Sequence, residues 1–239
     1  MSKLRIVHLY PEEMNIYGDG GNVLALTKRL EWRGIEHELV RVGVGQQYDF
    51  ASADIIFGGG GQDKGQLAVA EDLAAKADSL REAATSGVVM LMVCGMYQLF
   101  GHGFAPAEGD YIPGIGIFDA ETTAGKERMI GNVVVDTAWG QLVGFENHSG
   151  QTKLGLNQPA LGDVRMGYGN DGQSGDEGAI TQNVYGTYLH GSLLPKNPAF
   201  ADHLLLTAMR RKFGEDIILS PLDDHLEQLA HASATKLVQ

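Results

Sequence analysis

A continuous apolar run, Val88–Val93, constrains the fold of this chain more than any other segment. A strand that is apolar at every position leaves no face for water, which is typical of a parallel sheet covered by helices on both faces. Strand and helix candidates alternate along the chain as far as residue 100, with further strands at 4–9, 36–42 and 54–57 and helices at 22–32 and 66–85. This alternation predicts an α/β fold with a mostly parallel central sheet flanked by helices.

The pattern changes after about residue 110, where glycines separate short strand-like pieces. These pieces cover 131–137, 141–146, 178–180 and 183–189. Asn197 and Pro198 predict a helix start, with Asn197 as the N-cap, and a terminal helix is predicted over about 221–236. No linker-like segment separates the two halves. We therefore expect one domain over residues 1–239, with extra short strands in its second half and a core over about 4–215.

Composition excludes several classes of protein. The 239 residues are 44% hydrophobic, enough to bury a core, and the formal net charge of −12 includes no dense basic run that would bind nucleic acid. No stretch approaches the roughly 18 apolar residues of a membrane span, and no secretory signal begins the chain. A single cysteine excludes an internal disulfide framework. We expect a cytoplasmic protein without a metal site.

That cysteine, Cys94, directly follows the apolar strand and precedes a short helical segment that ends at Phe100. A nucleophile at such a junction projects above the carboxyl edge of the sheet, and a helix N-terminus favours the thiolate. A buried structural cysteine is the alternative, and position alone does not decide between them.

Two other features favour catalysis. The glycine run Gly58–Gly61 ends a strand and allows the close backbone approach of an oxyanion hole, although a tight connection or a phosphate loop would also use glycines. No Walker motif supports phosphate binding. A thiol that attacks an amide also needs a base, and His190 lies at the end of an apolar strand candidate. His148 is either a second candidate or a loop residue with a packing role.

Three motifs, in this order, resemble those of class I glutamine amidotransferases of the cobyric-acid-synthase-like branch. They are the oxyanion loop at 59–63, the nucleophile motif at 93–99 and the histidine motif at 185–191. Segments at 8–22, 144–150 and 167–170 further resemble the GatD family, the small glutaminase subunits of lipid II isoglutaminyl synthase. The resemblance spans roughly residues 5–215 and implies a flavodoxin-like, three-layer fold.

By this resemblance, Cys94 is the nucleophile, His190 the base and Arg128 the group that binds the substrate glutamine. The N–H groups of Gly60 and Gly95 would form the oxyanion hole. The resemblance also implies that ammonia from L-glutamine passes to a Mur-ligase-like (MurT-like) synthetase subunit, which holds ATP and Mg and amidates the D-glutamate of lipid II. This chain itself needs no cofactor. A glutaminase for another acceptor, such as a corrinoid carboxylate, and a non-catalytic scaffold are the alternatives.

The sequence departs from the family pattern at two positions. Met96 replaces a second glycine after the cysteine, which suggests a looser turn. Ser192 stands where most class I members have a glutamate, so no carboxylate next to His190 in the sequence orients its ring. The resemblance to GatD-like proteins implies that the partner subunit supplies the third catalytic carboxylate. We therefore expect the isolated chain to hydrolyse glutamine poorly.

Overall fold

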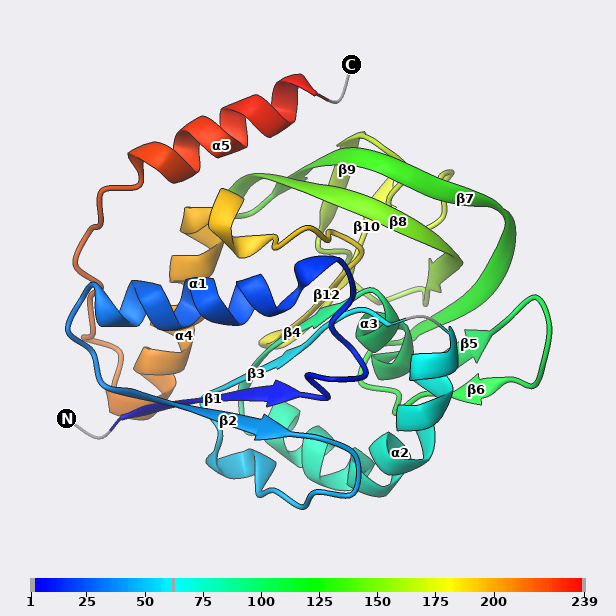
Figure 1. Ribbon diagram of the computed structural model, residues 1–239, viewed down its shortest axis with the longest axis horizontal. Helices are drawn as coiled ribbons and strands as arrows, with labels where there is room; N and C mark the ends of the chain where they lie inside the picture. Colours follow the sequence, from blue (N-terminus) through cyan, green and yellow to red (C-terminus); the bar gives the residue numbers. More distant parts are fainter. Residues whose placement is uncertain (1–2, 62, 238–239) are drawn as a thin grey trace.

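The computed structural model of the protein describes residues 3–61 and 63–237, and one of its two sheets contains the predicted parallel strands. This sheet has the strand order β11-β12-β4-β3-β1-β2 (Figure 1). Its strands are β1 (Leu4–Leu9), β2 (His37–Val42), β3 (Ile55–Gly58), β4 (Val89–Val93), β11 (Ala179–Thr181) and β12 (Val184–Thr187). From β12 to β2 all neighbours are parallel, and β11 is an antiparallel edge strand. The predicted mostly parallel α/β sheet is confirmed.

Helices cover both faces of this sheet, which explains why β4 is apolar throughout. All five residues of β4 are fully buried. The helices α1 (Gly20–Glu31) and α4 (Pro198–Phe213) contact each other on one face, and α2 (Asp63–Thr85) covers the other (Figure 1). The short helix α3 (Gly95–Phe100) begins one residue after β4 ends. Three short 3-10 helices cover Ile16–Gly18, Phe50–Ser52 and Leu194–Lys196.

The second sheet corrects the expectation that the added strands are short. Its order is β10-β9-β7-β5-β6, with β8 paired to β7. Its strands are β5 (Gly103–Ala105), β6 (Ile112–Pro113), β7 (Ala120–Thr137), β8 (Gly140–Leu154), β9 (Gly162–Met166) and β10 (Asp176–Glu177). β7 and β8 have 18 and 15 residues and form one long hairpin. A register shift between Ala124 and Met129 breaks the alternation of buried and exposed residues, so the sequence pattern shows only fragments of these strands.

Asn197 is the N-cap residue of α4, as predicted, but its side chain has another role. It precedes α4, but its side chain makes no capping hydrogen bond. Its amide instead bonds to both the N–H and the carbonyl of Val143 in β8, at 2.9 and 2.8 Å. Asn197 therefore fastens the second sheet to the start of α4.

The C-terminal helix α5 (His225–Lys236) begins later than the predicted 221 and has no buried residues. The buried Arg29 of α1 ties the segment before it to the body of the protein, with ion pairs of 2.6 Å to both Asp224 and Asp202. Among the described helices, none combines the length and apolar character needed to cross a bilayer.

Candidate active site

Cys94 lies at a sharp turn between β4 and α3. Its φ of +51° and ψ of −107° form a conformation that residues other than glycine rarely adopt. The N–H of Cys94 donates to the Thr187 carbonyl of β12 at 2.8 Å, and its carbonyl accepts from the N–H of Gln98 at 3.0 Å. Because the sheet and the helix hold both sides of the residue, the strained backbone persists. This is the geometry of a nucleophile elbow.

The side chain of Met96 does not loosen this turn. Met96 is fully buried, and a Cβ built on Gly58 would lie only 2.9 Å from Met96 Cγ. The missing side chain of Gly58 therefore makes room for Met96 between β3 and α3. The expectation of a looser turn is wrong, because the strained conformation at Cys94 is kept.

His190 follows β12, the strand beside β4, and is fully buried. Its N–H donates to the Phe145 carbonyl at 2.7 Å, and its carbonyl accepts from the N–H of Phe145 at 3.2 Å. The His190 ring interacts with Cys94 through both charge and a hydrogen bond. The structure thus brings the two predicted catalytic residues together and uses the β7–β8 hairpin to hold the histidine.

Asp19, directly before α1, places a carboxylate on the same ring. Its two oxygens lie 3.1 and 3.2 Å from His190 Nδ1, and both side chains are fully buried. The expectation that only a partner subunit supplies a carboxylate to His190 needs correction: Asp19 reaches the ring from 171 residues away in the same chain.

Ser192 helps to hold this carboxylate in place. Its Oγ donates to the carbonyl of Gly18 at 2.7 Å, directly before Asp19. A Cβ on Gly21 would overlap Ser192 Oγ, so the glycine allows the loop after His190 to approach α1. The residue that replaces the usual glutamate therefore binds the turn that carries Asp19.

In the glycine loop, the N–H of Gly60 does not have the oxyanion-hole role predicted for it. The N–H of Gly60 donates to Asp19 Oδ2 at 2.8 Å, so this N–H is already engaged and Gly60 is not the oxyanion donor that the sequence predicts. A Cβ on Gly60 would lie 2.6 Å from His190 Cε1, which shows how closely the loop packs on the ring. The next amide nitrogen, of Gly61, lies 3.1 Å from the position of a Cβ on Gly95. The amides of Gly61 and Gly95 are therefore neighbours beside Cys94.

The charges around His190 favour its protonated form. Burial alone lowers the pKa of the imidazole, but negative charge on Cys94 and the hydrogen bond to Asp19 outweigh burial and raise the pKa to about 10. His190 therefore holds a proton at neutral pH, beside the sulfur. A protonated imidazole is the form that can deliver a proton to a leaving nitrogen.

Arg128 lies on β7 at the register shift, and its side chain is exposed. Its Nε donates to Asn147 Oδ1 on β8 at 2.6 Å. Asn147 is two residues from Phe145, the backbone partner of His190. Arg128 therefore belongs to the same hairpin that holds His190.

A family model described as the CobB/CobQ-like glutamine amidotransferase domain matches residues 5–198. This chain belongs to that family. Two curated relatives are named lipid II isoglutaminyl synthase (glutamine-hydrolyzing) subunit GatD. The one from Staphylococcus aureus (strain N315) is 37% identical, over 89% of this chain and 87% of the relative. The one from Streptococcus pneumoniae (strain ATCC BAA-255 / R6) is 38% identical, over 95% and 88%.

More distant comparisons agree on the fold. A probable cobyric acid synthase from Methanoregula boonei (strain DSM 21154 / JCM 14090 / 6A8) is 34% identical, but over 64% of this chain and only 32% of that protein. The solved structure of PurLQS from Thermotoga maritima matches with a TM-score of 0.61 at 13% identity, over 87% of this chain and 99% of that one. At such low identity the structural likeness shows the fold alone.

This amidotransferase domain also contains a buried polar chain beneath the nucleophile that sequence reasoning missed. Gln66 Nε2 donates to Gln98 Oε1 at 2.5 Å, Gln98 Nε2 donates to the Tyr188 hydroxyl at 3.0 Å, and that hydroxyl lies 2.6 Å from Thr152 Oγ1. Gln66 Nε2 also lies 2.7 Å from the position of a Cβ on Gly95. The chain of bonds therefore fixes the backbone that follows Cys94. Spacing along the sequence gives no sign of it, because its members come from α2, α3, β8 and the segment after β12.

His148, the second candidate for the base, and Asn22 both have structural contacts. His148 stacks on Tyr188 with ring centroids 3.6 Å apart, and its Nδ1 lies 2.8 Å from the Gly150 carbonyl. Asn22 Oδ1 accepts the N–H of Leu194 at 2.8 Å. His148 is therefore a packing residue, and Asn22 holds the segment that leads to α4.

Proposed function

We propose that this chain is the glutaminase subunit of a lipid II isoglutaminyl synthase, with Cys94 as nucleophile and His190 as acid and base. The observation that carries the proposal is the strained turn at Cys94, whose side chain interacts electrostatically with the buried ring of His190. The two GatD relatives, which align over most of their length with this chain, support the assignment of the pathway.

The reaction has two halves. The Cys94 sulfur attacks the side-chain amide carbon of glutamine, and the N–H groups of Gly61 and Gly95 stabilise the oxyanion. His190 gives its proton to the amide nitrogen, the C–N bond breaks, and ammonia leaves a glutamyl thioester. Water then attacks the thioester while His190 accepts a proton. The C–S bond breaks, glutamate is released, and the sulfur is restored.

Asp19 acts through His190. An acceptor at Nδ1 selects the tautomer and ring orientation in which Nε2 exchanges protons with the sulfur and the leaving group. Asp19 also stabilises the positive charge of the protonated ring. Because Asp19 Oδ2 binds the N–H of Gly60 as well, the same carboxylate sets the position of the glycine loop.

Arg128 is proposed to bind the α-carboxylate of glutamine. Its guanidinium is exposed on the hairpin, and the planar fork of an arginine matches a carboxylate. The β7–β8 hairpin would then position both substrate and base.

The ammonia acceptor lies outside this chain in the proposal. We infer that a Mur-ligase-like partner in the cytoplasm holds ATP and Mg and uses the ammonia to amidate the D-glutamate of lipid II. A corrinoid acceptor is less well supported, because the chain matches only about a third of the Methanoregula boonei cobyric acid synthase but 87% of the Staphylococcus aureus GatD.

The experiment that tests the proposal is glutamate release by Cys94→Ala in the presence of the co-expressed Mur-ligase-like partner. Loss of release, with the complex intact by gel filtration, is expected. Unchanged release would eliminate the catalytic role of Cys94.

A further inference from the structure

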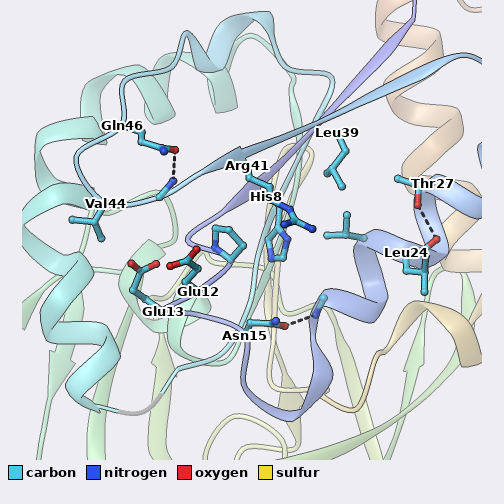
Figure 2. Close-up of a pocket in the computed structure, with 14 residues that line it drawn as sticks. His8, Glu12, Glu13, Asn15, Leu24, Thr27, Leu39, Arg41, Val44 and Gln46 are labelled. Atoms are coloured by element: carbon cyan, nitrogen blue, oxygen red, sulfur yellow. Dashed lines mark hydrogen bonds between the residues drawn. The ribbon is translucent and has the colours of Figure 1, made fainter.

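A pocket of about 520 Å³ lies between β1, β2 and the start of α1, and neither Cys94, His190 nor Arg128 lines it (Figure 2). This volume is in the range of small-molecule sites in proteins. Apolar side chains form part of the wall, and the polar groups come from β1, from β2 and from the segment after β1. The proposed glutaminase reaction uses none of them.

Two polar atoms in this pocket are buried and unsatisfied. His8 is 6% exposed, and its Nε2 has no hydrogen-bond partner among the residues that the structure describes. The same holds for Glu13 Oε2. Figure 2 shows the His8 ring near the middle of the pocket. Both atoms have almost no accessible surface, so they belong to the polar wall behind the pocket and do not contact an occupant directly.

The charges of the lining are divided between two sides. Arg41 lies beside His8, whereas Glu12 and Glu13 lie on the other side (Figure 2). The 12-residue helix α1 begins at this pocket with Gly20, whose N–H is capped by Asn15 Oδ1 at 2.7 Å. A helix N-terminus adds positive potential, although it makes no site by itself.

Burial and the nearby Arg41 lower the pKa of His8 to about 4. The ring is therefore neutral at physiological pH and adds no charge to the pocket. A dianion would meet Glu12 and Glu13 at unfavourable cost, and a simple cation would meet Arg41. A ligand with one charge of each sign satisfies both sides.

We propose that this pocket binds a zwitterion of the amino-acid class. Its carboxylate contacts Arg41 and the start of α1, and its ammonium group contacts Glu13. The side chain of the ligand lies against Val23, Leu39 and Val44, which also line the pocket.

The pocket shares a wall with the catalytic loop. The N–H of Ile16 donates to the Gly60 carbonyl at 3.0 Å, and a Cβ on Gly59 would overlap the carbonyl of Met14. The segment from Glu13 to Ile16 therefore touches the pocket on one side and the glycine loop on the other. An occupant that orders Glu13 also orders the segment that supports the loop.

Isothermal titration calorimetry tests the proposal on the full chain carrying Cys94→Ala, which prevents turnover and makes the result independent of the proposed glutaminase activity. The probes are L-glutamine, L-glutamate and L-leucine, with acetate and methylammonium as half-ligands. At least one amino acid is expected to bind saturably, and each half-ligand at least tenfold more weakly. Arg41→Gln and Glu13→Gln are each introduced into the Cys94→Ala chain. Each should raise the Kd of the bound amino acid about tenfold or more, since each removes a charged hydrogen-bonding partner.

Arg165→Gln is the matched control, because Arg165 is an exposed arginine of β9, in the second sheet, and does not line the pocket. It should leave the Kd unchanged. Two results overturn the proposal. Either none of the three amino acids binds, or binding persists unchanged in both pocket variants, which would place the ligand in the catalytic site instead.

Discussion

Replacing Asp19 by asparagine separates an in-chain carboxylate from one supplied by a partner. The substitution keeps the size of the side chain but removes the negative charge next to His190 Nδ1. A comparable loss in a Ser-His-Asp enzyme lowers kcat about 10⁴-fold. The Asp19 contacts of 3.1 and 3.2 Å are longer than the roughly 2.7–2.9 Å of strong charge-assisted bonds, so a smaller effect is expected. We expect kcat/KM to fall about 10²–10³-fold, or about 3–4 kcal/mol in the barrier.

The assay is glutamate release coupled to glutamate dehydrogenase, measured across pH for the chain alone and with its partner. Asp19 raises the pKa of His190, so its loss lowers that pKa. The imidazole then loses its proton at a lower pH, and the alkaline limb of kcat/KM should move to lower pH. Asp216→Asn, at an exposed position, is the matched control and should change neither quantity.

The reasoning is refuted if Asp19→Asn retains full kcat/KM and an unchanged pH profile in the partner complex. That result would indicate that the partner subunit, and not Asp19, supplies the carboxylate that orients His190. A loss in both the free chain and the complex supports Asp19 as the residue that orients His190.

Three other predictions concern the loop, the substrate and the core. Gly60→Ala places a Cβ 2.6 Å from His190 Cε1 and should lower kcat at least about tenfold. Gly43→Ala is the control, because its Cβ would make only an ordinary van der Waals contact, and it should leave kcat unchanged. Equal kcat values for the two variants would contradict the close packing of the loop on His190. Arg128→Ala should raise KM for glutamine about tenfold or more with a smaller change in kcat, and an unchanged KM would remove Arg128 from the substrate site. Burial raises the pKa of Glu177 to about 7 from 4.5, so the stability that is present below pH 4.5 should decline by about 3 kcal/mol as the pH rises through 7. Glu177→Gln should lose most of this pH dependence in urea unfolding, and a pH dependence equal to that of the parent chain would count against this origin.

The sequence predicts the parts of the site that lie next to apolar strands. Cys94 and His190 each follow such a strand, and parallel neighbours bring their carboxyl ends to one edge of the sheet. Local pattern and motif order are therefore sufficient for these two residues. The parallel sheet is predicted for the same reason.

Asp19 could not be found in this way. It lies in a glycine-rich turn, where aspartate commonly has only a local role. Its contact with His190 depends on how the start of α1 packs against the segment that follows β12. The choice between Gly60 and Gly61 also depends on Asp19, because that carboxylate engages the N–H of Gly60. Such assignments require the three-dimensional arrangement.

The long β7–β8 hairpin was hidden for a different reason. Its register shift and its glycines interrupt the alternation by which a strand is recognised, although hydrogen bonds continue on both sides of the shift. This hairpin contributes Phe145 to hold His190 and carries Arg128. A sequence pattern that shows only short strands therefore underestimates how much of the site this sheet supports.

The most direct test of the account is mass spectrometry of the chain quenched in acid during glutamine turnover. The account predicts a glutamyl thioester on the peptide that contains Cys94, and a larger amount of it where thioester hydrolysis is slowed. Continued glutamate release without an adduct on Cys94, or with the adduct on another residue, would contradict the assignment of Cys94 as the nucleophile.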